Sequence, residues 1–100
     1  MGEAMMPGIS KLLSTDIQIC SPTDLRMLIQ NLKELIALGK IRQIWPAEAP
    51  FATETKISDL NENGPWPDYL EWYFATEDNR RYQLSVDTYH GAGGYWRIIS

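Results

Sequence analysis

Residues 21–40, SPTDLRMLIQNLKELIALGK, constrain the fold more than any other segment, because they carry a long and regular helical signal. Ser21 is a good N-cap, Pro22 suits the first helical position, and Gly39 provides a stop at the other end. Between them, apolar residues recur at the three- and four-residue spacing of one helix face: Leu25, Leu28, Ile29, Leu32, Leu35 and Ile36. We predict an amphipathic helix of about four to five turns, whose apolar face must be covered by another element.

The last third of the chain alternates apolar and polar residues with the period of two that is typical of half-buried strands. Three segments do so, at residues 69–76, 81–89 and 95–99. Short segments rich in turn-forming residues separate them, so we predict an antiparallel β-meander. Trp72 and Trp96 lie on its apolar face and are expected to be core residues.

Weaker strand signals precede the meander. Residues 16–20 and 40–45 are predicted as short strands, and residues 53–57 as a further short or edge strand. The sequence therefore predicts a two-layer α+β fold, with one amphipathic helix packed on an antiparallel sheet of four to five strands. Residues 16–100 are expected to form this single domain, and residues 1–15 a loosely ordered N-terminal arm.

Several absences narrow the class of protein. No apolar run reaches the roughly 20 residues of a membrane-spanning helix, and the first residues lack the basic and apolar regions of a secretory signal. Cys20 is the only cysteine, which excludes an internal disulfide framework and a zinc site built from cysteines. We therefore expect a cytoplasmic protein with no membrane association, no cofactor and no metal.

The net charge of −4 comes entirely from the second half of the chain. Residues 53–78 hold seven acidic residues and one lysine, Lys56, which gives this segment a net charge of −6. Such a segment repels phosphate backbones, so nucleic acid is not an expected partner. It would attract a basic protein partner, although the same charges also serve solubility alone.

The segment SVDTYHGAGGYWRI, residues 85–98, contains the only histidine and three glycines. In phosphate-binding glycine loops, a helix follows and directs its N-terminus at the anion, whereas a strand is predicted to follow here. We therefore interpret Gly91, Gly93 and Gly94 as residues that give a strand-to-strand turn its positive φ angles.

His90 follows Asp87 by three residues, and residues three apart on a strand point to opposite faces. Asp87 is then poorly placed to orient His90 as a general base, and we predict no catalytic residue. An alternative is a small-ligand-binding or enzymatic site at the Asp87–Gly94 hairpin, with Asp87, Tyr89 and His90 as its polar groups.

Trp66 lies between two prolines in GPWPDY, inside the acidic segment. An aromatic residue in such a rigid segment is typical of binding hot spots, and the alternative is that Trp66 covers the core. Trp45 also precedes a proline. On the next predicted strand, Tyr69, Glu71 and Tyr73 share the polar face. Aromatic residues surrounded by carboxylates suit a basic protein surface.

These features lead to one hypothesis and two alternatives. The hypothesis is a small non-enzymatic protein-interaction domain that binds a basic partner, and one concrete form is an inhibitor or immunity-type protein directed at a basic enzyme. The residues expected to bind the partner are Glu62, Trp66, Asp68, Tyr69, Glu71 and Tyr73. The alternatives are the ligand or enzymatic site at the hairpin and a self-assembling subunit.

Overall fold

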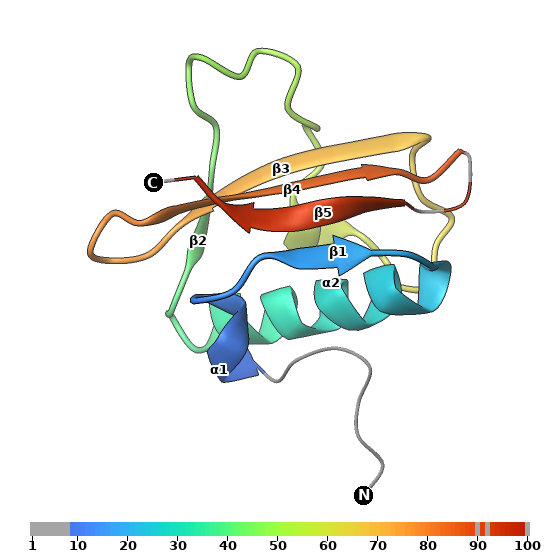
Figure 1. Ribbon diagram of the computed structural model, residues 1–100. Helices are drawn as coiled ribbons and strands as arrows, with labels where there is room; N and C mark the ends of the chain where they lie inside the picture. The colour runs from blue at the N-terminus through green and yellow to red at the C-terminus, as the bar shows by residue number, and fades with distance from the viewer. Residues whose placement is uncertain (1–8, 90, 92, 100) are drawn as a thin grey trace, which may run out of the picture.

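A computed structural model describes residues 9–89, 91 and 93–99 of the chain. In chain order its elements are α1 (Ile9–Leu12), β1 (Ile17–Ile19), α2 (Pro22–Ala37), β2 (Arg42–Ile44), the 3-10 helix η1 (Ile57–Asp59), β3 (Tyr69–Ala75), β4 (Arg81–Asp87) and β5 (Gly93–Ile98). The strands form one five-stranded antiparallel sheet, and α2 lies against one of its faces (Figure 1). This is the predicted two-layer α+β fold. We call the face toward α2 the inner face and the opposite one the outer face.

The long helix α2 begins and ends where its sequence predicts. Ser21 Oγ accepts a hydrogen bond from the Asp24 amide at 3.1 Å, and the Asp24 carboxylate accepts one from the Cys20 amide at 3.1 Å. Gly39, with a φ of +76°, follows the last turn and ends the helix. The apolar stripe faces the sheet, and its buried members are Leu25, Leu28, Ile29, Leu32 and Leu35.

The strands follow the order β1-β5-β4-β3-β2 across the sheet. β3, β4 and β5 are neighbours in both sequence and space, which confirms the C-terminal meander. The predicted strands at 16–20 and 40–45 form the two edges of the sheet: β1 pairs with β5, and β2 pairs with β3, where Ile44 lies opposite Tyr73. The first strand of the domain therefore lies beside the last.

The prediction of a strand at 53–57 is wrong. Thr53 does contact β3, because its amide donates to the Glu71 carbonyl at 2.8 Å and its Oγ1 accepts from the Glu71 amide at 2.8 Å. The chain then leaves the sheet and begins η1 at Ile57. Ile57 is 1% exposed and belongs to the core, so burial of this side chain favours the path away from the sheet edge.

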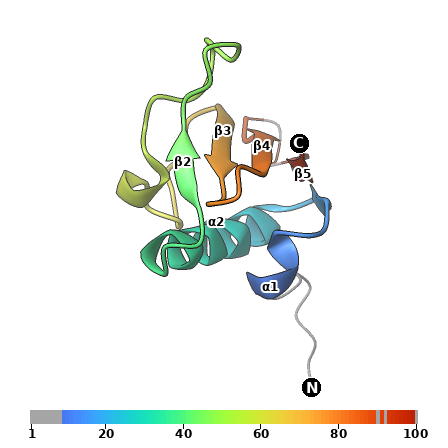
Figure 2. The ribbon, with the colours of Figure 1, turned by 90° about the vertical axis from the view of Figure 1, so that its left-hand side faces the viewer.

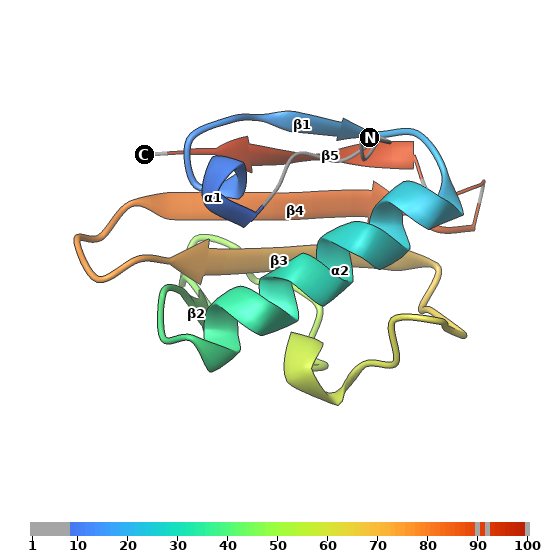
Figure 3. The same cartoon turned by 90° about the horizontal axis from the view of Figure 1, so that it is seen from below.

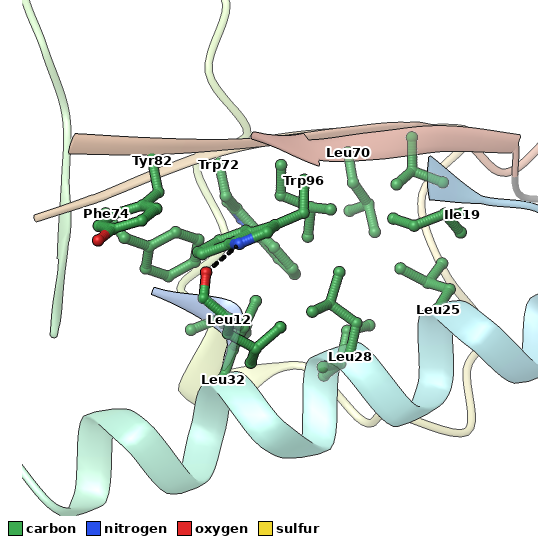
Figure 4. Close-up of a cluster of buried hydrophobic side chains, with 14 of the residues drawn as sticks. Leu12, Ile19, Leu25, Leu28, Leu32, Leu70, Trp72, Phe74, Tyr82 and Trp96 are labelled. Carbon is green, nitrogen blue, oxygen red and sulfur yellow. Dashed lines mark hydrogen bonds between the residues drawn. The ribbon is translucent and has the colours of Figure 1, made fainter. Parts of the chain in front are cut away.

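The core lies between α2 and the inner face of the sheet (Figure 4). The sheet contributes a row of fully buried side chains: Leu70, Trp72, Phe74, Tyr82, Leu84, Val86 and Trp96. The Trp96 ring stacks on Tyr82 with the ring centroids 5.2 Å apart, and it lies tilted against Phe74 at 5.7 Å. Trp72 and Trp96 are therefore core residues, as predicted, and their large area contributes strongly to stability.

The described part of the expected N-terminal arm joins this core. Leu12 of α1 is fully buried, and its carbonyl accepts a hydrogen bond from Trp96 Nε1 at 2.8 Å (Figure 4). The next carbonyl, that of Leu13, accepts one from the Tyr82 hydroxyl at 2.7 Å. In the view from below, α1 lies next to α2 beneath the β4 and β5 side of the sheet (Figure 3). Residues 1–8 lie outside the described residues.

The glycines of the last hairpin have two different roles. Gly91 has a φ of +110°, which agrees with the predicted turn. Gly93 and Gly94 lie in β5 without a positive φ, so this part of the interpretation is wrong. Gly94 instead lets two strands approach, because a Cβ built there would lie 2.0 Å from the Ser85 carbonyl oxygen. A Cβ at Gly93 would meet nothing within 4 Å.

Candidate functional site

The outer face of the sheet carries the polar residues of β3, β4 and β5. The register pairs residues of β3 with residues of β4: Tyr69 with Asp87, Glu71 with Ser85, and Tyr73 with Gln83. On the other side of β4, β5 adds Tyr95 and Arg97, opposite Ser85 and Gln83. The row of Tyr69, Glu71 and Tyr73 thus lies on the face away from α2, as the alternation of β3 predicts.

A chain of hydrogen bonds crosses three strands in the middle of this face. The Tyr73 hydroxyl donates to a Glu71 carboxylate oxygen at 2.6 Å and accepts from Gln83 Nε2 at 3.2 Å. Gln83 Oε1 accepts in turn from Arg97 Nε at 3.2 Å and from Arg97 Nη2 at 3.0 Å. The Arg97 guanidinium also lies 4.9 Å from the centre of the Tyr95 ring. A carboxylate and a guanidinium therefore end a network that holds these side chains in fixed positions.

Tyr73 is the least accessible of the residues predicted to bind a partner from this face. Its side chain lies on the outer face but is only 9% exposed. Burial, followed by the adjacent Glu71 carboxylate, raises the pKa of Tyr73 to about 12. Tyr73 therefore stays protonated at neutral pH and acts as a hydrogen-bond donor inside the face, with little area left for contact with another molecule.

Two acidic residues and two exposed tyrosines lie together at the end of the sheet where β3 begins and β4 ends. Tyr69 is 47% exposed and Tyr89 is 71% exposed. The Tyr89 amide donates to the Asp68 carbonyl at 3.1 Å and to Asp87 Oδ1 at 3.0 Å. The Tyr69 hydroxyl lies 2.5 Å from Ser85 Oγ. We call Asp68, Tyr69, Asp87 and Tyr89 the acidic tyrosine cluster.

Glu62 and Trp66, also predicted to bind a partner, lie elsewhere in the fold. The Glu62 carboxylate is 3.1 Å from Lys33 Nζ of α2, on the helix side of the molecule. A hydrogen bond from its own backbone amide, and then Lys33, hold the pKa of Glu62 below its ordinary value. Trp66 packs against the core, and its buried Nε1 has no hydrogen-bond partner among the described residues. The structure thus separates these two residues from Tyr69 and Glu71.

The hairpin residues named as an alternative site have local roles where they are described. Asp87 Oδ1 accepts a hydrogen bond from the Tyr89 amide, which stabilises the turn after β4. His90 lies outside the described residues. Within the part of the chain that the structure covers, no three His, Cys, Asp or Glu side chains are grouped to hold a metal ion.

One exposed element was missed by the sequence reasoning, the segment WPAEAPFA at residues 45–52. This projecting loop rises from the outer-face side of the sheet, opposite α2 (Figures 1 and 2). Phe51 in it is 86% exposed, and Trp45 at its start is 49% exposed. A Phe between a proline and an alanine belongs to no periodic pattern. The sequence therefore singles out only Trp45 in this segment, through the proline that follows it.

Comparisons with known proteins identify no relative of this chain. No protein-family model matches the sequence, and neither a curated protein nor a solved structure shows significant similarity to it. For the residues that the structure describes, none of the helices combines the length and apolar character needed to cross a membrane.

Proposed function

We propose that this chain is a small, non-enzymatic protein-interaction domain that binds a basic protein partner through the acidic tyrosine cluster and the adjoining Glu71. The observation that carries the proposal is the pairing of Tyr69 with Asp87, which sets the Asp87 carboxylate beside an exposed tyrosine, with Asp68 and the exposed Tyr89 next to them in the chain. Tyrosine offers a large contact area at low cost in conformational entropy. Carboxylates around it steer and orient a cationic surface.

The distribution of charge over the outer face supports binding at the end of the sheet that holds the acidic tyrosine cluster. Arg81 lies opposite Ala75, at the far end of β3, and is ion-paired with Glu48 at 2.9 Å. Arg97 lies opposite Gln83, near the middle of the face. The basic residues of β4 and β5 are thus displaced from the cluster along the strands, which favours a negative potential at the end where β3 begins.

One concrete form of this function is an inhibitor or immunity-type protein that blocks a basic enzyme such as a nuclease. The cleft of such an enzyme presents cationic groups to the phosphates of its substrate. Carboxylates held at fixed positions can occupy those places. The hydrogen-bond network from Glu71 to Arg97 supports a rigid surface, and a rigid surface loses less entropy on binding.

The test begins with affinity capture by the tagged chain at low and at moderate salt, followed by purification of any stoichiometric basic protein. Affinity is then measured for Asp68→Asn, Asp87→Asn and Glu71→Gln. These variants remove charge but keep an oxygen acceptor, so the turn bond to Tyr89 and the bond from Tyr73 are retained. We expect each variant to weaken binding about three- to five-fold at low salt, and to reduce the salt dependence.

Two matched variants serve as controls. Glu77→Gln removes a charge at the opposite end of β3, and Glu62→Gln removes one on the helix side. Both are expected to leave the affinity unchanged. Equal losses in the control variants would show only a general effect of net charge. An unchanged affinity and salt slope in the cluster variants would contradict the proposed surface.

The two alternatives predict different results with the same purified chain. A self-assembling subunit would scatter light as an oligomer whose size depends on concentration. A ligand or enzymatic site at the hairpin would show a bound small molecule or an activity that His90→Ala abolishes. Both alternatives stay predictions. If no basic protein is captured, the result favours them over the proposed function.

A further inference from the structure

The projecting loop, residues 45–52, interrupts the edge of the sheet beside β3. Ile44 pairs with Tyr73, and the amide of Thr53 donates to the Glu71 carbonyl at 2.8 Å. The chain therefore leaves β3 at one position and returns to the same edge two residues farther along. Loops of this length with neighbouring ends are compact surface elements that often carry function.

The loop has several constraints on its conformation. The Ala49 amide donates to the Pro46 carbonyl at 3.0 Å, and the Ala52 amide donates to the Ala49 carbonyl at 3.2 Å, so two consecutive turns shape it. Pro46 and Pro50 fix two φ angles. Glu48, the only charged residue of the loop, pairs with Arg81 of β4 at 2.9 Å. Such a loop loses little conformational entropy on binding.

The side chain presented at the end of this loop is apolar. Phe51 is 86% exposed, the largest exposure among the large hydrophobic residues described as exposed. A Phe this exposed adds little buried area to the core. Its contact with water is unfavourable, so burying the ring against another molecule would lower the free energy. Aromatic side chains on rigid protrusions are enriched at the centres of protein interfaces, where they enter pockets of the partner.

We propose that the projecting loop inserts Phe51 into an apolar cleft of the same basic partner that contacts the acidic tyrosine cluster. This inference rests on the proposed function and adds the shape of the partner to it. The loop projects on the outer-face side of the sheet (Figure 1), its ends meet β3 at Tyr73 and Glu71, and the cluster begins two residues away at Tyr69. The partner therefore has a concave apolar site bordered by basic residues, which meet the cluster.

The first experiment needs no partner. Backbone order parameters from NMR relaxation are measured for the amides of residues 47–49, 51 and 52. We expect values near those of rigid backbone, about 0.85, because the turns and the prolines hold the loop. Values below about 0.6 would mean that the loop samples many conformations, and would overturn a preformed insertion element.

The second experiment uses the basic partner purified by affinity capture. Phe51→Ala is expected to weaken its binding at least about 30-fold, the effect of truncating a hot-spot side chain. This loss should be the same at low and high salt, because the contact is apolar. Phe51→Leu should lose less. Leu38→Ala is the matched control, because Leu38 is 59% exposed beyond the end of α2 and should not matter.

The loop and the cluster can fail independently in this experiment. Full affinity of Phe51→Ala, together with weakened Asp68→Asn and Asp87→Asn variants, would overturn the insertion of the loop and leave the proposed function standing. A large loss in Phe51→Ala with unaffected charge variants would support the loop and overturn the acidic surface. An equal loss in Leu38→Ala would also overturn the inference, because the effect would then not be specific to the loop.

Discussion

Trp96 and Tyr95 are neighbours on β5 and face opposite sides of the sheet. Trp96 is fully buried on the inner face, where it stacks on Tyr82 and donates its indole N–H to Leu12. Tyr95 is 37% exposed on the outer face, beside the Arg97 guanidinium. One side chain is placed by apolar packing, and the other by polar contacts at a surface that water still reaches.

The two faces differ in what a change of side chain would cost. The inner face excludes water, so each lost contact leaves a cavity or an unpaired polar group. The outer face is ordered by hydrogen bonds from Glu71 through Tyr73 and Gln83 to Arg97, and water can replace many of them. The inner face therefore decides whether the chain folds, and the outer face decides which side chains it presents at the surface.

Truncation of Trp96 should have the largest effect on stability. Trp96→Ala removes the ring that packs on Tyr82 and Phe74, and we expect a loss of about 3–5 kcal/mol in the free energy of unfolding. Tyr95→Ala, one residue away, should lose less than about 1 kcal/mol. Urea unfolding followed by circular dichroism measures both. Similar losses in the two variants would break the distinction between the faces.

A methyl group added at Gly94 should have an intermediate effect. Its Cβ would lie 2.0 Å from the Ser85 carbonyl oxygen and 2.7 Å from Val86 Cα, so backbone atoms must move. We expect Gly94→Ala to destabilise the fold by about 1–3 kcal/mol. Gly93→Ala meets open space and should stay within about 0.5 kcal/mol of the parent chain. Equal midpoints of thermal unfolding for the two variants would show that β4 and β5 are not this close.

The smallest effect is expected for the hydroxyl of Tyr73. Tyr73→Phe removes the hydrogen bond donated to Glu71 and the one accepted from Gln83, both at a face where water can replace them, and should cost about 0.5–1.5 kcal/mol at neutral pH. The pKa of Tyr73, about 12 in the fold against 10.0 ordinarily, also predicts a pH effect. Because the folded chain holds this proton more tightly, the contribution of Tyr73 to stability should be fully present below about pH 10 and be lost as the pH rises toward 12.

Chemical unfolding at a series of alkaline pH values tests this prediction. Tyr73→Phe should lose part of the alkaline fall in stability. The rest has another source in Tyr82, because burial also raises the pKa of that hydroxyl. If Tyr73→Phe kept the whole alkaline fall, the hydroxyl of Tyr73 would not be protected as the structure indicates.

The local features of this fold were readable from the sequence. The spacing of Leu25, Leu28 and Leu32 predicts α2, and Ser21 and Gly39 predict its ends. The alternation in β3 and β4 predicts which side chains face α2 and which face away. Each of these signals spans a few residues and depends on helix or strand geometry alone, so no knowledge of distant contacts is needed.

The candidate site was only partly readable, because its members are brought together by pairing between strands. The outward orientation of Tyr69 and Glu71 follows from alternation, but the neighbours of Tyr69 follow from the register with β4. Glu62 is close in sequence to Asp68 and belongs to the helix side instead, where it meets Lys33. Trp66 had two plausible positions, and packing against the core was the one adopted.

By itself, the sequence determined the class of the fold, the helix, the meander and the inward set of aromatic residues. Tertiary structure alone decided that β1 lies beside β5, that Leu12 meets Trp96, that Gly94 must lack a side chain, and that residues 45–52 project. The physical reason is separation along the chain. Periodicity acts over one or two turns or pleats, whereas Leu12 and Trp96 are joined only when the whole sheet has formed around the core.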